Sequence, residues 1–162
     1  MMNAKSVASF SVNHDTLKRG VYVSRKDAVS GNVLTTFDIR LKLANQEPVL
    51  GNPEIHTLEH LFAVYLRGDS GWEDKVIYIG PMGCRTGFYL IVAGDFSSEE
   101  ILPLVKGMFN AAMNFGGAVP ATTSIECGNY LEHNLAFAKF EARKFYDEVL
   151  ACIKPENLVY PE

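Results

Sequence analysis

Residues 52–68 constrain the fold more than any other segment, because they combine a helix start, a helical period and a helix stop. Asn52 is a capping residue type, Pro53 suits the first helical position, and Gly68 ends the pattern. Between these limits apolar residues recur at helical spacing: Ile55, Leu58, Phe62 and Tyr65. The sequence therefore predicts a helix from Asn52 to Arg67 with one face in a hydrophobic core.

Strand patterns lie on both sides of this helix. Four segments are predicted as strands: 21–25, 33–43, 76–79 and 88–93. In the second of them, Asp38, Arg40 and Lys42 alternate with apolar residues. Successive side chains of a strand point to opposite faces, so this alternation is typical of a half-buried strand with one polar face.

Two further helices complete the predicted fold. Ser97 and Glu100 form a capping box at the start of the second helix, and the third is expected from Tyr130 to Ile153. Strands grouped with long helices predict the α+β class, with a mainly antiparallel sheet and helices packed against it. A chain of 162 residues is expected to form a single domain spanning 1–162.

Composition argues against several classes of partner. The net charge is −4 and no cluster of Lys and Arg is present, so we expect no nucleic-acid partner. Apolar runs such as 88–93 are far shorter than the roughly 20 residues of a membrane span, so we expect no membrane partner. No export signal is visible at the N-terminus. We therefore expect a cytoplasmic protein whose three cysteines are free or metal-bound thiols.

The segment His56-Thr57-Leu58-Glu59-His60 gives the clearest chemical signal. Positions i and i+4 of a helix share a face, so His56 and His60 can bind one metal ion. Glu59 flanks the same face and can act as a proton-transfer base. The pattern H-x-x-E-H also occurs in inverted zinc peptidases, so a small metallopeptidase is the alternative function.

Two histidines do not bind a metal tightly, so a third ligand is needed. Cys84 and Cys127 each stand beside a glycine at the boundary of a predicted element, where the backbone can approach a site closely. His133, six residues after Cys127, is a rival ligand. Cys152 lies in an apolar helical stretch and is expected to be a small core residue. The residues alone leave the third ligand open.

Three motifs, in this order, resemble those of the S-ribosylhomocysteine lyases (LuxS family): residues 56–62 (HTLEHLF), 81–89 (PMGCRTGFY) and 127–128 (CG). The segments 37–40 (FDIR) and 9–14 (SFSVNH) are also similar to N-terminal motifs of that family. The resemblance extends from about Ser9 to about Ala142 and so covers most of the chain.

The resemblance implies a chemistry and a set of residues for it. The metal ligands would be His56, His60 and Cys127, and the ion Fe²⁺, with Zn²⁺ or Co²⁺ as substitutes. The reaction cleaves the thioether of S-ribosylhomocysteine in the methyl cycle. Its products are homocysteine and 4,5-dihydroxy-2,3-pentanedione, the precursor of the autoinducer-2 signal of quorum sensing. Cys84 and Glu59 would carry the protons that move the sugar carbonyl before β-elimination.

The resemblance also implies where the substrate binds. Ser9, His14 and Arg40 match family positions that line the substrate pocket, and that pocket lies between the two subunits of a homodimer. Asn13 and Glu126 stand where many members carry Asp and Gln. Neither position belongs to the implied metal ligands or proton carriers.

Overall fold

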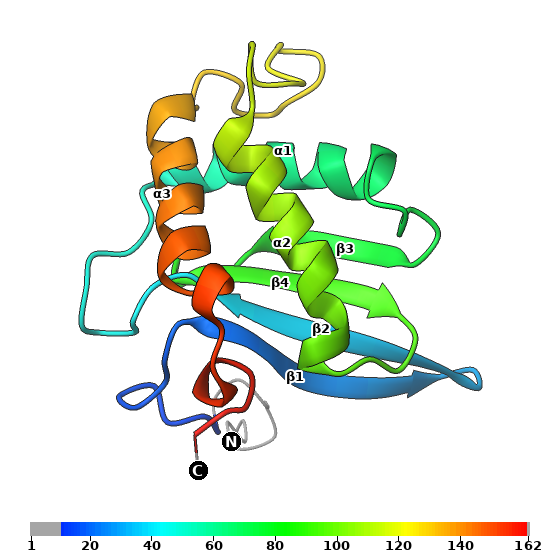
Figure 1. Cartoon of the computed structure of the whole chain (residues 1–162). Coiled ribbons are helices and arrows are strands. Elements are labelled where there is room, and N and C mark those ends of the chain that lie inside the picture. Colours follow the sequence, from blue (N-terminus) through cyan, green and yellow to red (C-terminus); the bar gives the residue numbers. More distant parts are fainter. Residues whose placement is uncertain (1–10, 162) are drawn as a thin grey trace, which may run out of the picture.

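A four-stranded sheet forms one layer of the computed structural model, which describes residues 11–161 (Figure 1). Its strands are β1 (Gly20–Val29), β2 (Asn32–Arg40), β3 (Val76–Pro81) and β4 (Gly87–Ala93). Their spatial order is β1-β2-β4-β3, and every neighbouring pair is antiparallel.

Three helices form the second layer over one face of this sheet (Figure 1). They are α1 (Asn52–Gly68), α2 (Ser98–Asn114) and α3 (Leu135–Glu148), and two short 3₁₀ turns follow, Leu150–Cys152 and Pro155–Asn157. The predicted α+β class with an antiparallel sheet is confirmed. Within residues 11–161, no helix is both long enough and apolar enough to cross a bilayer.

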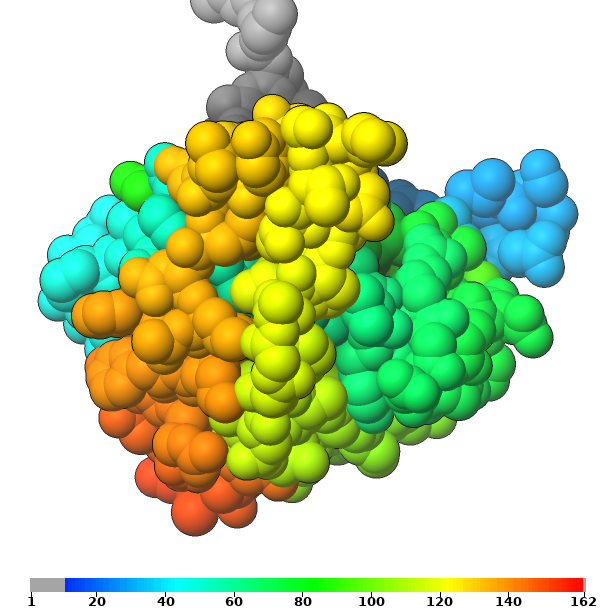
Figure 2. Space-filling model, turned by 90° about the horizontal axis from the view of Figure 1, so that it is seen from above, coloured from blue at the N-terminus to red at the C-terminus, as the bar shows by residue number. Residues whose placement is uncertain are grey.

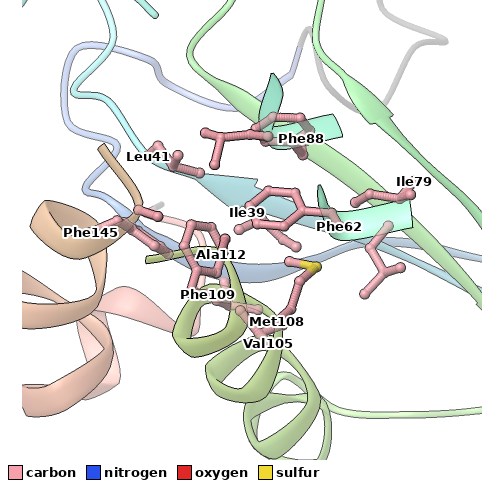
Figure 3. Packing of buried hydrophobic residues seen from close by; sticks show 14 of the residues in the cluster. Ile39, Leu41, Phe62, Ile79, Phe88, Val105, Met108, Phe109, Ala112 and Phe145 are labelled. Atoms are coloured by element: carbon pink, nitrogen blue, oxygen red, sulfur yellow. The ribbon is translucent and has the colours of Figure 1, made fainter. Parts of the chain in front are cut away.

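A chain of buried aromatic rings joins the two layers (Figure 3). The Phe62 ring of α1 lies 5.1 Å from that of Phe88 on β4 and 4.8 Å from that of Phe109 on α2. Phe109 in turn lies 4.9 Å from Phe145 on α3. Burying one such ring stabilises the fold by about 1.5–3 kcal/mol. These four residues therefore fix all three helices against the sheet.

The helix starts follow the predicted signals in one case and depart from them in the other. At α2 the capping box is confirmed: Ser97 Oγ accepts from the Glu100 N–H, and the Glu100 carboxylate accepts from the Ser97 N–H. At α1 the N-cap is Gly51, and the prediction of Asn52 as the capping residue is wrong. The Asn52 Oδ1 instead accepts a hydrogen bond from Arg85 Nη1 at 3.2 Å.

The third helix is shorter than the predicted segment from Tyr130 to Ile153. Its N-cap is Asn134, whose Oδ1 accepts from the Phe137 N–H at 3.2 Å, so the residues before it form a loop. The chain leaves the α-helix after Glu148, and Cys152 in the following 3₁₀ turn is exposed. The predicted core position of Cys152 is therefore wrong.

The predicted polar face of β2 is not a solvated face. Asp38 and Arg40 are 1% and 2% exposed, because the C-terminal segment covers that side of the sheet. The Tyr160 ring stacks on the Tyr22 ring at 4.8 Å, and the Tyr160 hydroxyl donates to Asp38 Oδ2 at 2.9 Å. Both faces of β2 are thus buried at its C-terminal end.

Strand β2 ends at Arg40, three residues before the predicted end at Leu43. The next two N–H groups, of Leu41 and Lys42, both donate to the backbone oxygen of Thr86, at 2.9 and 3.0 Å. Two donors that share one acceptor cannot continue a regular ladder, so the strand stops there.

Candidate metal centre

Four potential metal ligands meet where α1 passes the loop 115–134, and their ligand atoms all lie within 4.8 Å of one another: His56, His60, Cys127 and His133. We call this group the His/Cys cluster. Helix α1 supplies two members, and the loop supplies Cys127 and His133, two of the three candidates for the third ligand. The remaining candidate, Cys84, is not a member of the cluster. Figure 2 shows the loop after α2 (yellow) lying beside the residues that lead into α3 (orange).

Backbone carbonyls of the loop orient both histidines of α1. His56 Nδ1 donates to the Glu132 oxygen at 2.9 Å, and His60 Nδ1 donates to the Pro120 oxygen at 2.8 Å. A carbonyl oxygen only accepts, so each neutral ring carries its proton on Nδ1 and has an unprotonated Nε2. Histidines that bind metals are typically held in this way.

The third imidazole is oriented by the buried hydroxyl of Thr57. This hydroxyl donates to the Pro53 oxygen at 2.7 Å and accepts from the Asn134 N–H at 2.9 Å. Its hydrogen is used, so in the 3.2 Å contact with His133 Nδ1 the imidazole is the donor. His133 Nε2 therefore has a free lone pair, and it is buried with no hydrogen-bond partner in the described structure.

The chemistry of the donors fits a divalent transition metal. Cys127 Sγ lies 3.3 Å from His56 Nε2 and accepts from the Asn129 N–H at 3.4 Å. Burial lowers the pKa of His133, and the neighbouring rings of His56 and His60 lower it further, which favours the neutral imidazole that a metal requires. Imidazole nitrogen with thiolate sulfur suits zinc and similar ions.

Glu59 lies at the rim of the His/Cys cluster. Its Oε2 is 3.8 Å from His60 Nε2, and its side chain is 34% exposed. No carboxylate belongs to the cluster as the described residues form it. From this place Glu59 can reach a molecule bound at the cluster without being a ligand.

Cys84 lies in the turn 82–87 between β3 and β4, which two backbone hydrogen bonds of 2.9 Å close. Arg85, at φ 59°, takes the left-handed conformation there. The Cys84 thiol is exposed and lies 3.1 Å from the Thr86 hydroxyl. Burial raises the pKa of this thiol, but the hydrogen bonds from Thr86 and the charge of Arg40 outweigh burial and leave the pKa lowered.

The Cys84 turn packs at the start of α1, the helix that carries the two histidines. The Leu50 N–H donates to the Arg85 oxygen at 3.0 Å, and the Arg85 guanidinium binds Asn52 in the first turn of α1. Over residues 11–161, however, no hydrogen bond joins Cys84 to the His/Cys cluster.

Arg40, predicted to line the substrate pocket, lies beside this turn, where its Nη1 binds Thr86 Oγ1. Arg40 binds Asp38 through Nε at 3.1 Å and through Nη2. Burial raises the pKa of Asp38, while the charges of Arg40 and His14 and the hydrogen bonds from Arg40 and Tyr160 oppose the rise, so His14 lies near the same carboxylate. Ser9 lies outside the described residues.

Comparison with known proteins decides the family. Residues 7–156 match the family model of S-ribosylhomocysteinase (LuxS). The chain belongs to this family. Proteins named S-ribosylhomocysteine lyase from Desulfotalea psychrophila and Porphyromonas gingivalis are each 51% identical to it, over 97% and 98% of this chain and 99% of each relative. One of the same name from Borreliella burgdorferi is 48% identical over 97% of this chain and 99% of its own length. The resemblance read from the motifs is confirmed.

Three side chains that orient the candidate site residues of this LuxS-family chain were missed by the sequence analysis: Thr57, Thr86 and Tyr160. Thr57 and Thr86 lie inside the motifs but are of a residue type that carries no chemical signal alone. Tyr160 lies 122 residues from its partner Asp38, so no local pattern joins them. The pairing of Asp38 with Arg40 could have been predicted, because residues i and i+2 of a strand share a face and Asp38 precedes Arg40 by two.

Replacing Thr57 with Val should destabilise the metal-free protein. The change keeps the volume but leaves the Asn134 N–H and His133 Nδ1–H without their acceptor, which should cost about 1–3 kcal/mol of the free energy of unfolding. Urea denaturation of chelator-treated protein measures this. Thr57→Ser keeps the hydroxyl and is the control; equal stability of Thr57→Val and wild type would contradict the hydrogen-bond assignment.

Proposed function

We propose that the chain is a metal-dependent lyase that cleaves S-ribosylhomocysteine to homocysteine and 4,5-dihydroxy-2,3-pentanedione. The observation that carries the proposal is the His/Cys cluster, with ligand atoms within 4.8 Å of one another, in a chain of the LuxS family. The name of the relatives, which share about half of their residues with this chain over nearly its full length, supports the substrate.

We assign His56, His60 and Cys127 as the metal ligands, with Fe²⁺ as the ion and Zn²⁺ or Co²⁺ as substitutes. The unprotonated Nε2 atoms of the two histidines, and the Cys127 thiol 3.3 Å from His56 Nε2, support this set. Leaving His133 out of it keeps one coordination position for substrate, as a catalytic site needs. When bound, the ion would supply Lewis acidity that stabilises negative charge on the oxygens of the opened sugar. Ferrous iron and reduced thiols suit the cytoplasm, where we place the enzyme.

The proposed reaction needs two proton carriers. A thioether sulfur leaves as a thiolate only when a carbonyl stands two carbons away, so protons must first be removed from sugar carbons and returned to their neighbours. We assign the first of these transfers to Cys84, whose lowered pKa makes the thiolate available as a base. We assign the later transfers and the β-elimination to Glu59, because it lies beside the cluster, 3.8 Å from His60 Nε2.

We further propose that two copies of the chain form the active unit. Five large apolar side chains are exposed in the loop that carries Cys127 and His133 and on α3, and we call them the apolar patch: Ile125, Tyr130, Leu131, Phe137 and Phe140. Such a patch is typical of a protein–protein interface. A second copy would cover this patch and bring the pocket residues Ser9, His14 and Arg40 to a shared substrate site.

The metallopeptidase alternative finds less support. Peptidases with the same helix pattern take an acidic third ligand, whereas the cluster in residues 11–161 offers only His and Cys donors. A peptidase would also have no use for Cys84 and its lowered pKa.

The ligand set predicts how single substitutions change metal content. Removing His56, His60 or Cys127 should abolish tight binding of one ion per chain, because two ligands do not hold a labile ion. Metal analysis of anaerobically purified variants measures this. In cobalt-loaded protein, the thiolate-to-cobalt charge-transfer band should vanish in Cys127→Ala and persist in His133→Ala. Loss of metal from His133→Ala with retention by Cys127→Ala would refute the set.

The dimer predicts a sensitivity of assembly to the exposed loop. The protein should sediment as a dimer at micromolar concentration, and Leu131→Glu should shift it toward monomer with loss of activity. Leu131 is 80% exposed, so the change should leave the monomer folded. Val29→Glu at the exposed tip of the β1–β2 hairpin is the control. A monomeric wild type with full activity would contradict the shared site.

The proton carriers predict loss of turnover without loss of metal. Cys84→Ala and Glu59→Gln should each keep the ion and lose homocysteine release by roughly 10²–10⁴-fold. The two variants should stall at different points: Cys84→Ala at the starting aldose, and Glu59→Gln at a partly isomerised ketose. Carbon NMR of labelled substrate in single-turnover experiments separates them. Near-normal thiol release by metal-replete Cys84→Ala would overturn the assignment.

A further inference from the structure

Thr86 joins the Cys84 thiol to the buried guanidinium of Arg40. It is 5% exposed and stands at the end of the turn 82–87, directly before β4. Its Oγ1 lies 2.5 Å from Arg40 Nη1 and 3.1 Å from Cys84 Sγ. One hydroxyl therefore lies between the Arg40 guanidinium, whose charge lowers the pKa of the Cys84 thiol, and the thiol itself.

The direction of both hydrogen bonds follows from the groups present. A guanidinium has donors only, so the Thr86 oxygen accepts from Arg40. The hydroxyl hydrogen is then free for a sulfur acceptor, and Cys84 Sγ at 3.1 Å is much closer than Met82 Sδ at 3.9 Å. A hydroxyl that accepts from a cation becomes a stronger donor, and such a donor favours a thiolate over a thiol.

The surroundings hold this hydroxyl in place. The backbone oxygen of Thr86 accepts from two successive N–H groups at the end of β2. The next residue, Gly87, pairs with Arg40, and a Cβ there would lie 2.0 Å from the Ile39 oxygen, so only glycine allows β2 this close. Asp38 fixes the guanidinium from its other side. Thr86 therefore has little freedom to turn away from either partner.

We propose that Thr86 is a positioning residue that keeps Cys84 ionised. Its hydroxyl accepts a hydrogen bond from the Arg40 guanidinium and donates one to the Cys84 sulfur. The inference rests on the proposed role of Cys84 as a proton carrier. Arg40 faces the thiol from β2. Its guanidinium donates to Asp38, and Asp38 also accepts from the Tyr160 hydroxyl. His14 lies near Asp38, and Arg85 of the turn itself binds Asn52.

Alkylation of Cys84 as a function of pH tests the proposal without turnover. Metal-loaded protein is treated with iodoacetamide, and modification of the Cys84 peptide is followed by mass spectrometry, with the exposed Cys152 as internal reference. Thr86→Val should raise the pH midpoint of Cys84 alkylation by about one unit, which slows the reaction about tenfold at pH values below both midpoints. Thr86→Ser keeps the hydroxyl and should retain the wild-type midpoint.

The outcomes separate this inference from the lyase function. An unchanged midpoint in Thr86→Val overturns the role of Thr86 and leaves the lyase intact, whereas full activity of Cys84→Ala overturns the lyase mechanism and leaves the ionisation result intact. If Thr86→Val does not fold, Thr86→Ala removes the same hydroxyl without a branched side chain and should show the same rise. A raised midpoint in Thr86→Ser as well would show that packing of the threonine methyl, and not the hydroxyl, sets the ionisation.

Discussion

The packing of Leu58 and Phe62 against the sheet fixes the rotation of α1 about its own axis, because both side chains are fully buried. With the rotation fixed, His56 and His60 point to the loop 115–134, whose carbonyls hold their Nδ1 atoms. His56 and His60 are four residues apart and lie on the same face of the helix. A rotation of α1 about its axis would therefore move both rings away from these acceptors. The hydrophobic core and the His/Cys cluster are therefore two faces of one helix, and neither can shift alone.

Local patterns in the sequence predicted the parts of the fold that depend on near neighbours. The period of α1, the capping box of α2 and all four strands were predicted, because each needs only residues a few positions apart. The start of α3 was wrong, since Asn134 caps the helix after a loop that the apolar period did not reveal. The exposure of Cys152 was missed because that period continues beyond the end of α3.

The candidate site was likewise predictable only where it depends on residues close in sequence. The spacing of His56 and His60 predicted two ligands on one face of a helix, but a loop whose contacts with them span 60 and 76 residues of sequence completes the cluster. Spacing alone left Cys84, Cys127 and His133 open as the third ligand, and the fold brings Cys127 and His133, but not Cys84, to the cluster. The buried state of Asp38 and Arg40 was missed, because alternation shows that a strand has two faces but not what covers the second. A buried ion pair of this kind adds little net stability, because the cost of removing both charges from water offsets their attraction.

The hydrogen bond between Tyr160 and Asp38 has a consequence for how the protein folds during synthesis. Residues that are synthesised early, on β2, bury a carboxylate and a guanidinium whose surroundings are complete only when a tyrosine 122 positions later has emerged from the ribosome. During translation, the β1–β2 hairpin can pair early, because its contacts are local, yet the side of β2 that carries Asp38 and Arg40 stays open to water. The surroundings of Arg40, and through Arg40 those of the turn that holds Cys84, are therefore completed only when the C-terminal segment packs against the sheet.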